Sequence, residues 1–148
     1  MKTTHRNAAH AKRSYRVADP FALWKVVAGC TGFNQAEQTT CALPGRLAWS
    51  ALRAGTADNG DIATLTDIIA ICIIATKSSD ALVQQTVDAA RAAMCTVADR
   101  YHRCQRWGVD AAALRDIPPV LDVYDALLEH ATGGQLAEWI NAIRRVHA

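Results

Sequence analysis

Apolar residues recur at helical spacing through most of the chain beyond residue 35. From there the spacing predicts a helix that ends at Gly55, a residue suited to a C-terminal cap. Pro44 lies inside the pattern, and because proline lacks a backbone donor the helix is expected to start or to kink there. The predicted buried face of this helix consists of Leu43, Leu47, Ala51 and Leu52.

The most apolar segment of the chain, residues 68–76, belongs to a second predicted helix. Turn residues at 58–60 precede it, and Asp61 is a suitable N-cap. The density of β-branched side chains also suits a buried strand, so both forms stay open, although the three- and four-residue spacing favours a helix. That spacing is carried by Ile62, Leu65, Ile69, Cys72, Ile73 and Thr76.

A longer helical pattern follows, from an expected cap at Ser79 to an expected stop at Gly108. At about 28 residues it would span roughly 40 Å, enough for the spine of a domain. Its apolar stripe comprises Leu82, Val83, Val87, Ala90, Met94, Val97, Tyr101 and Cys104.

Two further helices are predicted in the C-terminal part of the chain. Asp110 is a suitable cap for the first, and Pro118-Pro119 is expected to bend or break it because two consecutive residues lack a donor. The second follows Gly133-Gly134, and its apolar positions are Leu136, Trp139, Ile140, Ile143 and Val146. The patterns together predict an all-α fold, a single-domain irregular bundle of about five helices.

Charge divides the chain into a basic head and a mildly acidic body. Residues 1–16 carry five positive charges and no negative one, whereas the remainder has 11 basic and 14 acidic side chains, a net charge of −3. We therefore expect a basic, flexible N-terminal arm at 1–18 and a helical domain at 19–148. Such an arm gains affinity for phosphate or an acidic surface by counterion release, or it serves only as a soluble tail. Its cations are Lys2, Arg6, Lys12, Arg13 and Arg16.

Signals for export and for membrane insertion are both missing from the pattern. No apolar region of the kind found in secretory signals follows the basic head. The apolar run at 68–76 is about half of the ~20 residues that a membrane span needs. Five cysteines, an odd number without CxxC spacing, are typical of reduced thiols. These features predict a cytoplasmic protein with no membrane partner.

The strong sequence signatures of catalysis are absent, among them the nucleophile elbow, the P-loop and the zinc-protease motif. His102 lies near Asp99 and Cys104, but on a helix His102 and Cys104 point about 200° apart and cannot cooperate. Neither does their spacing suit tetrahedral zinc. Asp122 and Asp125 share a helical face, which a solvated surface explains better than acid–base chemistry. We therefore expect no enzymatic activity, no catalytic residue, no metal and no cofactor.

Residues 99–108 combine arginines with aromatic rings at the end of the long predicted helix. Arginine pairs with phosphate and aromatic rings stack on bases, so this cluster can extend a nucleic-acid contact from the arm. The helix dipole also favours cations here, and Asp99 is placed to pair with Arg103, so a structural role is the alternative. The cations of the cluster are Arg100, Arg103 and Arg106.

Two tryptophans, Trp49 and Trp107, are candidates for a protein interface. Trp49 lies away from the predicted buried face of its helix and is expected to be partly exposed, whereas Trp139 follows the apolar stripe of the tail helix and is expected in the core. Exposed tryptophan is enriched at binding hot spots. A protein partner and a homodimer are both compatible with this composition.

Four segments of the chain, in their order, carry a resemblance to known proteins. They are a basic stretch with SYR, then LRAGTADNGDIATLTDII, then ADRYHRCQRWGVDAAALRDI, then LLEHATGGQLAEWINAIRRV. Together, over roughly residues 14–147, the chain resembles a group of small helical proteins of proteobacterial prophages and plasmids. Pro44 and Pro118-Pro119 depart from the uninterrupted helices expected of that group. The resemblance implies no particular activity, but it implies a mobile-element context, in which small proteins act by binding as regulators or as inhibitors of host factors, including defence complexes.

The sequence thus favours a non-enzymatic accessory protein of a mobile element that binds a protein partner and inhibits or regulates host machinery. The alternative is a nucleic-acid-binding regulator that uses the basic arm and the cluster at 100–106. Salt dependence distinguishes them, because affinity that rests on phosphate contacts falls steeply as salt rises.

Overall fold

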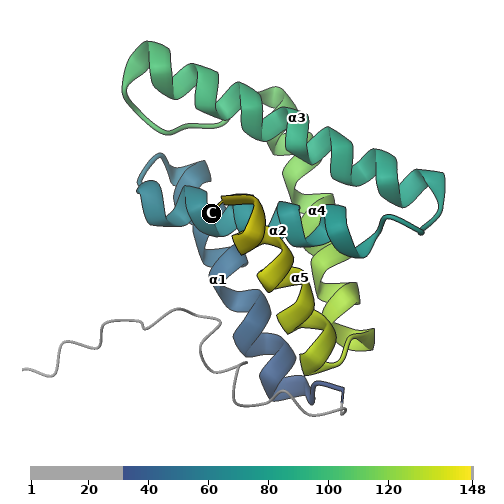
Figure 1. The fold of residues 1–148 in the computed structure, drawn as a ribbon. Coiled ribbons are helices and arrows are strands. Elements are labelled where there is room, and N and C mark those ends of the chain that lie inside the picture. The colour runs from purple at the N-terminus through teal and green to yellow at the C-terminus, as the bar shows by residue number, and fades with distance from the viewer. Residues whose placement is uncertain (1–31, 148) are drawn as a thin grey trace, which may run out of the picture.

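The computed structural model describes residues 32–147, which form five α-helices (Figure 1). They are α1 (Gln35–Ala54), α2 (Asn59–Ala75), α3 (Ala81–Cys104), α4 (Ala111–His130) and α5 (Gly133–His147). The predicted all-α bundle of five helices is confirmed. The alternative of a buried strand at 68–76 is wrong, since residues 68–75 are the second half of α2. The expected arm and the boundary between residues 18 and 19 lie outside the described residues.

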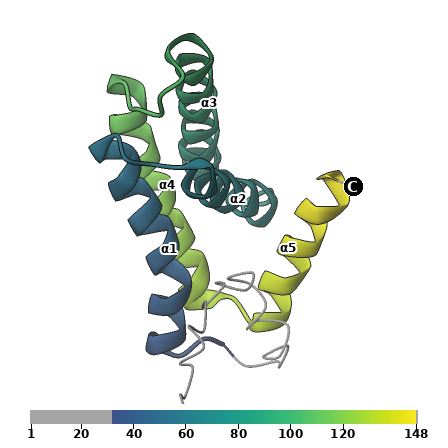
Figure 2. The same cartoon turned by 90° about the vertical axis from the view of Figure 1, so that its left-hand side faces the viewer.

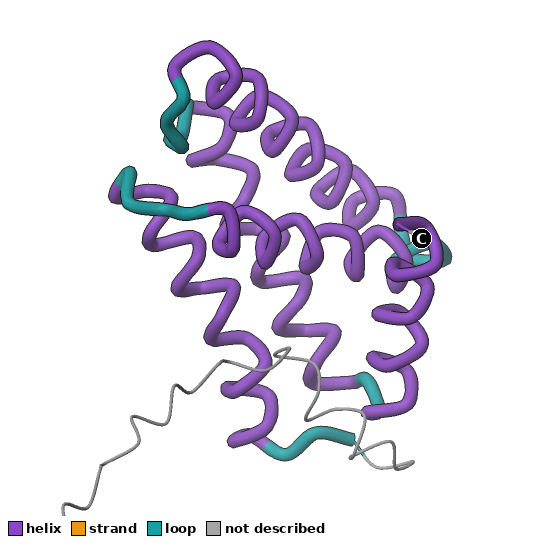
Figure 3. The backbone as a smooth tube through the Cα atoms, turned by 60° about the vertical axis from the view of Figure 1, so that its left-hand side comes forward, coloured by secondary structure: helices purple, strands orange, loops and turns teal. Residues whose placement is uncertain are grey.

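Helix α2 is the centre of the bundle and packs against each of the other four helices. Helices α1 and α4 run antiparallel side by side, and α3 crosses above them (Figures 1 and 2). Helix α5 returns along another side of α2. Thr132, the residue before α5, forms an isolated antiparallel bridge with Gly32 at the start of the described chain. Short connections link the helices throughout (Figure 3). Because α2 is surrounded, it can be apolar on nearly all sides.

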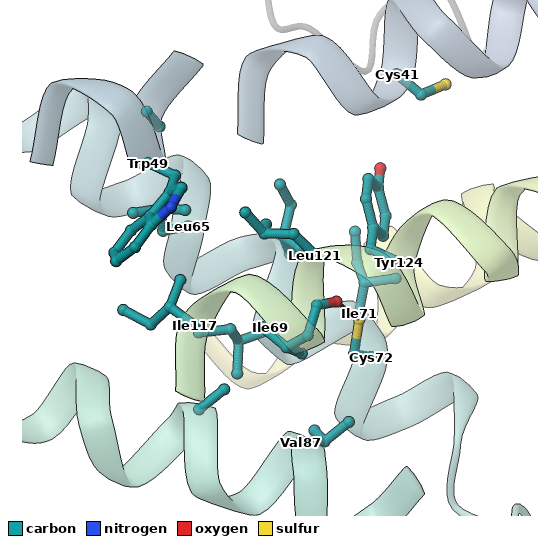
Figure 4. Close-up of a cluster of buried hydrophobic side chains, with 14 of the residues drawn as sticks. Cys41, Trp49, Leu65, Ile69, Ile71, Cys72, Val87, Ile117, Leu121 and Tyr124 are labelled. Carbon is teal, nitrogen blue, oxygen red and sulfur yellow. Dashed lines mark hydrogen bonds between the residues drawn. The ribbon is translucent and has the colours of Figure 1, made fainter. Parts of the chain in front are cut away.

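One hydrophobic core draws on all five helices. Figure 4 shows part of it, with labelled side chains from α1, α2, α3 and α4. Leu65 and Ile71 of α2, Leu121 of α4 and Leu136 of α5 are buried almost completely. Burial of each such side chain contributes about 1.5 to 3 kcal/mol relative to exposure. The predicted core positions Leu65 and Ile69 are confirmed, whereas Leu82, expected in the stripe of α3, is 72% exposed. The prediction for Leu82 is wrong because this residue lies in the first turn of α3, at the edge of the bundle.

Helices α1 and α2 each begin at a polar N-cap residue, whose side chain accepts a hydrogen bond from a backbone N–H of the first turn. The Asn34 side chain accepts a hydrogen bond from the backbone N–H of Glu37, and the Glu37 carboxylate accepts one from the backbone N–H of Asn34. Asp58 and Asp61 form the same reciprocal pair at the start of α2. The prediction of Asp61 as N-cap is therefore wrong by three residues. Asp58 is the N-cap, and Asp61 is the N3 residue of the capping box, whose carboxylate accepts from the backbone N–H of Asp58.

The ends of the later helices follow the same rules. Asp80, and not the predicted Ser79, caps α3, whereas the predicted cap Asp110 is confirmed for α4. The backbone amide of Ala113 holds the pKa of Asp110 below its usual range. Gly55, with φ at 72°, is confirmed as the left-handed C-cap of α1, a conformation that glycine adopts without steric cost.

No helix starts at Pro44 or breaks at Pro118-Pro119, so these two of the predicted alternatives are wrong. A kink at Pro44 and a bend at Pro118-Pro119 stay predictions. Helix α1 runs through Pro44, and α4 runs through Pro118-Pro119. Each proline deprives the carbonyl four residues earlier of its helical donor. The residues that carry these carbonyls are exposed, so water can replace the missing donor. They are Thr40, Leu114 and Arg115.

A candidate protein-binding surface on the first helix

Helix α1 buries a different side from the one that the sequence predicts; we call this difference the rotation of α1. Leu43 and Leu47, expected in the core, are 50% and 60% exposed. The side of α1 that faces the bundle instead carries Gly45, where a β-carbon would overlap the side chain of Ile68 and lie 3.5 Å from Cδ2 of Leu121. Small residues on this side let α1 approach α2 and α4 closely. The buried residues of α1 are Cys41, Gly45, Ala48, Trp49 and Leu52.

Trp49 lies in the core, because the side of α1 that faces the bundle differs from the predicted one. It is only 7% exposed and lies among the buried side chains drawn in Figure 4. The expectation that Trp49 is partly exposed at a protein interface is therefore wrong. As a member of the buried core cluster, its ring has a structural role.

The rotation leaves an uncharged strip along the solvent side of α1. We call this strip the α1 outer face, and it consists of Ala36, Thr40, Leu43, Leu47, Ser50 and Ala54. All six residues are exposed, and they alternate in steps of four and three along the entire helix. The hydroxyl of Thr40 donates to the carbonyl of Ala36 at 2.8 Å, which makes the strip less polar still. The charged residues of α1 lie beside the strip: Glu37, Arg46 and Arg53.

This composition is unusual for the solvent side of a surface helix, which normally carries charged and polar residues. Two leucines one turn apart form its centre. The four-and-three spacing is the spacing of a helix–helix seam, in which side chains from one helix insert between those of another. The α1 outer face therefore has the spacing and the apolar centre of such a seam.

Ion pairs fix α1 to α4 beside this face. Nη2 of Arg46 lies 2.6 Å from Oδ1 of Asp122 and 2.5 Å from Oδ2 of Asp125. The two hydrogen bonds, with that of Asp122 the larger cause, raise the pKa of the Arg46 guanidinium. Asp122 and Asp125, predicted to lie on a solvated face, are 71% and 36% exposed, and both accept from Arg46 across the contact between α1 and α4. The sequence signal for this role was the one-turn spacing of the two acids, but Arg46 lies 76 residues before Asp122.

The predicted basic cluster lies at the far end of α3. Arg100, Arg103 and Arg106 are exposed, and none of them forms an ion pair within residues 32–147. The predicted pair between Asp99 and Arg103 is therefore not formed. The other predicted cations, Lys2 to Arg16, lie outside the described residues.

The rings of Trp107 and Tyr101 contact other residues of this protein. The two rings stack with centroids 3.9 Å apart and planes inclined by 15°. Nε1 of Trp107 donates to Oδ1 of Asn59 at 3.0 Å, which links this end of α3 to the start of α2. The same turn ends α3 at Cys104, with Gln105 left-handed, so the predicted stop at Gly108 is wrong. Trp107 is half-buried, and one face of its ring is already covered.

Buried ionisable groups within residues 32–147 are suited to packing. Burial, with a smaller effect of Glu37, raises the pKa of the Cys41 thiol to about 12, and burial likewise raises that of Cys72 to about 12. Burial also raises the pKa of Tyr124, whose side chain lies between the two cysteines in Figure 4. Groups protonated so strongly are poor nucleophiles and bases.

A pocket of about 150 Å³ lies between the end of α2 and the start of α3. Its volume is below the roughly 300 to 1,000 Å³ of typical small-molecule sites. Its lining residues are Ile73, Thr76, Lys77, Gln84, Val87 and Asp88. We assign no chemistry to it.

Two further features concern metals and membranes. Within the part of the chain that the structure describes, no three metal-ligating side chains gather at one place. None of the five helices has both the length and the apolarity to cross a bilayer.

Neither the protein-family models, nor the curated proteins, nor the solved structures contain a match to this chain.

Proposed function

We propose that this protein acts by binding another protein through the α1 outer face. The observation that carries the proposal is the exposure of Leu43 and Leu47 at the centre of an uncharged helical strip. Apolar side chains that become buried at the centre of an interface act as binding hot spots. Completing the burial of two half-exposed leucines contributes roughly 2 to 3 kcal/mol, since a full leucine contributes about 1.5 to 3 kcal/mol.

The proposed role is that of a non-enzymatic inhibitor or regulator of host machinery, encoded by a mobile element. Support for the mobile-element context is the order of segments from SYR to INAIRRV, which resembles small prophage and plasmid proteins. Support for a binding role is the open apolar strip with Leu43 and Leu47 at its centre. A host factor with an apolar helix or groove is the class of partner that the strip fits.

The test is capture of partners from the natural host cell by a chain tagged after Ala148, with nuclease treatment before elution. We expect one protein to remain bound to the wild type and to be lost from a Leu43→Glu/Leu47→Glu variant. Leu82→Glu is the matched control, because Leu82 is equally apolar and 72% exposed but lies on α3. A partner retained equally by all three chains would overturn the assignment to α1.

A second candidate function rests on the three exposed arginines of α3. Arg100, Arg103 and Arg106 form no ion pair within residues 32–147, so they are free to contact phosphate. Together with the arm cations they would give nucleic-acid affinity that falls steeply with salt. Replacing all three by Ala is expected to reduce the slope of log affinity against log salt by about 3 if each contacts one phosphate. An unchanged slope would exclude these arginines from the contact.

A further inference from the structure

The start of the described chain is fixed against the connection between α4 and α5. Gly32 forms an antiparallel bridge with Thr132, and a β-carbon on Gly32 would lie 3.9 Å from the carbonyl oxygen of Ala131. The next residue, Phe33, is buried, and its carbonyl accepts a hydrogen bond from Nε2 of Gln38 at 3.0 Å. The chain therefore enters the bundle at one defined place, beside the residue that precedes α5.

The sense of this bridge indicates where the preceding segment leads. In an antiparallel pair, the chain before Gly32 leads the same way as the chain after Thr132, which is the start of α5. Positions 133 and 134 are both glycine, so no side chain of these two residues blocks the path. A segment that continues the direction of the bridge passes along α5.

Helix α5 has a second apolar row beside its buried stripe. The stripe contains Leu136 and Ile140, and among the five helices of the described chain α2 is the only one against which α5 packs. Figure 2 shows α5 apart from α1 and α4. The second row repeats in steps of three and four, and it consists of Trp139, Ala142 and Val146. Trp139 and Ala142 are half-buried, whereas Val146 is 81% exposed, so the row is open at its outer end.

An apolar segment of sufficient length precedes the described chain. Five of the seven residues at 21–27 are large and apolar: Phe21, Leu23, Trp24, Val26 and Val27. Residues 27 and 21 lie five and eleven positions before Gly32, so an extended chain carries them at most roughly 17 Å and 36 Å from the bridge. Val146 lies about 20 Å along α5 from its start, since each helical residue adds about 1.5 Å. The segment is therefore long enough to span the row.

We propose that residues 21–27 of this chain dock along α5 and cover the row from Trp139 to Val146. The bridge directs the segment to α5, and the row is an apolar surface on that helix. Because large apolar side chains are stabilised when they leave water, the segment and the row each supply the surface that the other needs for burial. The segment then belongs to the helical domain, and the cations at 2–16 stay outside it. This inference concerns α5 and does not depend on the role proposed for α1.

The experiment is photo-crosslinking in the full chain, with the photoreactive residue benzoylphenylalanine in place of Val146. Position 146 is exposed, so the bulky ring disturbs no buried contact. The same substitution at Leu82, which is 72% exposed but lies on α3, is the matched control. Peptide mass spectrometry maps the links after irradiation. A mixture of isotope-labelled and unlabelled chains distinguishes links within one chain from links between two.

We expect the probe at 146 to link to residues 21–27 of its own chain and the probe at 82 to give no such link. Leu23→Asp/Trp24→Asp should lower the yield at least about tenfold, because buried charges are costly. Thr3→Asp/Thr4→Asp adds the same charges outside the segment and should leave the yield unchanged.

Three outcomes would overturn the docking. The first is no link from the probe at 146 to residues 21–27, and the second is an equal yield of such links from the probes at 146 and 82. The third is links that form only between two chains, which would mean that a second copy covers the row. Each outcome is read in chains with the natural segment, so the result does not depend on how the double variants fold.

Discussion

Gly45 of α1 lies against Ile68 of α2 with no room between them for a β-carbon. The contact lies on the side of α1 that faces the bundle, and the atom that a β-carbon would overlap is Cδ1 of Ile68. Gly45→Val is expected to destabilise the fold by about 1 to 3 kcal/mol, because the added atoms must displace Ile68 in a packed core. Denaturant unfolding measures the change. Ser50→Val on the opposite side of α1 is the control, with a change within about 0.5 kcal/mol; similar losses for both variants would contradict the orientation of α1.

Ile69 tests the central position of α2. It is buried, and Ile69→Ala is expected to lower the free energy of unfolding by about 2 to 5 kcal/mol through lost burial and the cavity left behind. Ile73, one turn later, is only partly buried, so Ile73→Ala should cost clearly less. Equal effects from the two variants would mean that the chain does not pack around α2 as described.

The pairing of Arg46 with Asp122 and Asp125 is expected to contribute little stability despite its short distances. The Arg46 side chain is 39% exposed and that of Asp122 is 71% exposed, so solvent screens the pair. Arg46→Met, which keeps the aliphatic stem, should cost at most about 1 kcal/mol, and the difference from wild type should shrink as salt rises. A loss of several kcal/mol that persists in high salt would contradict this account.

Thiol labelling tests the burial of the cysteines. Iodoacetamide at pH 8 is expected to modify Cys95 and Cys104, which are exposed, and to spare Cys41 and Cys72. The two buried thiols have a pKa of about 12 in the folded chain and stay protonated at this pH. Peptide mass spectrometry reads the sites, and unfolding in denaturant should equalise them. Rapid labelling of Cys72 in the native protein would contradict its position in the core.

The helix content was predictable from sequence because the three- and four-residue periodicity is strong and local. Asp110 and Gly55 act within one turn and were predicted correctly. Asp61 and Ser79 were not the caps, because a second capping residue, Asp58 or Asp80, lies within three residues of each. The stop of α3 was not predicted correctly, because the left-handed cap is Gln105, with φ at 55°, and residues other than glycine seldom adopt that conformation.

The candidate site was hidden from sequence reasoning by the composition of α1. That helix has two apolar stripes, one with Leu43 and Leu47 and one with Gly45 and Trp49. Larger aliphatic residues favour the first stripe as the core, but the close approach to Ile68 requires the small residue of the second. Which stripe is buried is therefore decided by the partner helices, and periodicity alone does not contain that information.

The most direct test of the α1 outer face is the affinity of a captured partner, measured by surface plasmon resonance for wild type, Leu43→Glu and Leu82→Glu at equal protein concentration. We predict that Leu43→Glu weakens binding at least about tenfold because it places a charge at the centre of the interface, and that Leu82→Glu binds like the wild type. Equal affinity of Leu43→Glu and the wild type would contradict the claim that this face binds the partner.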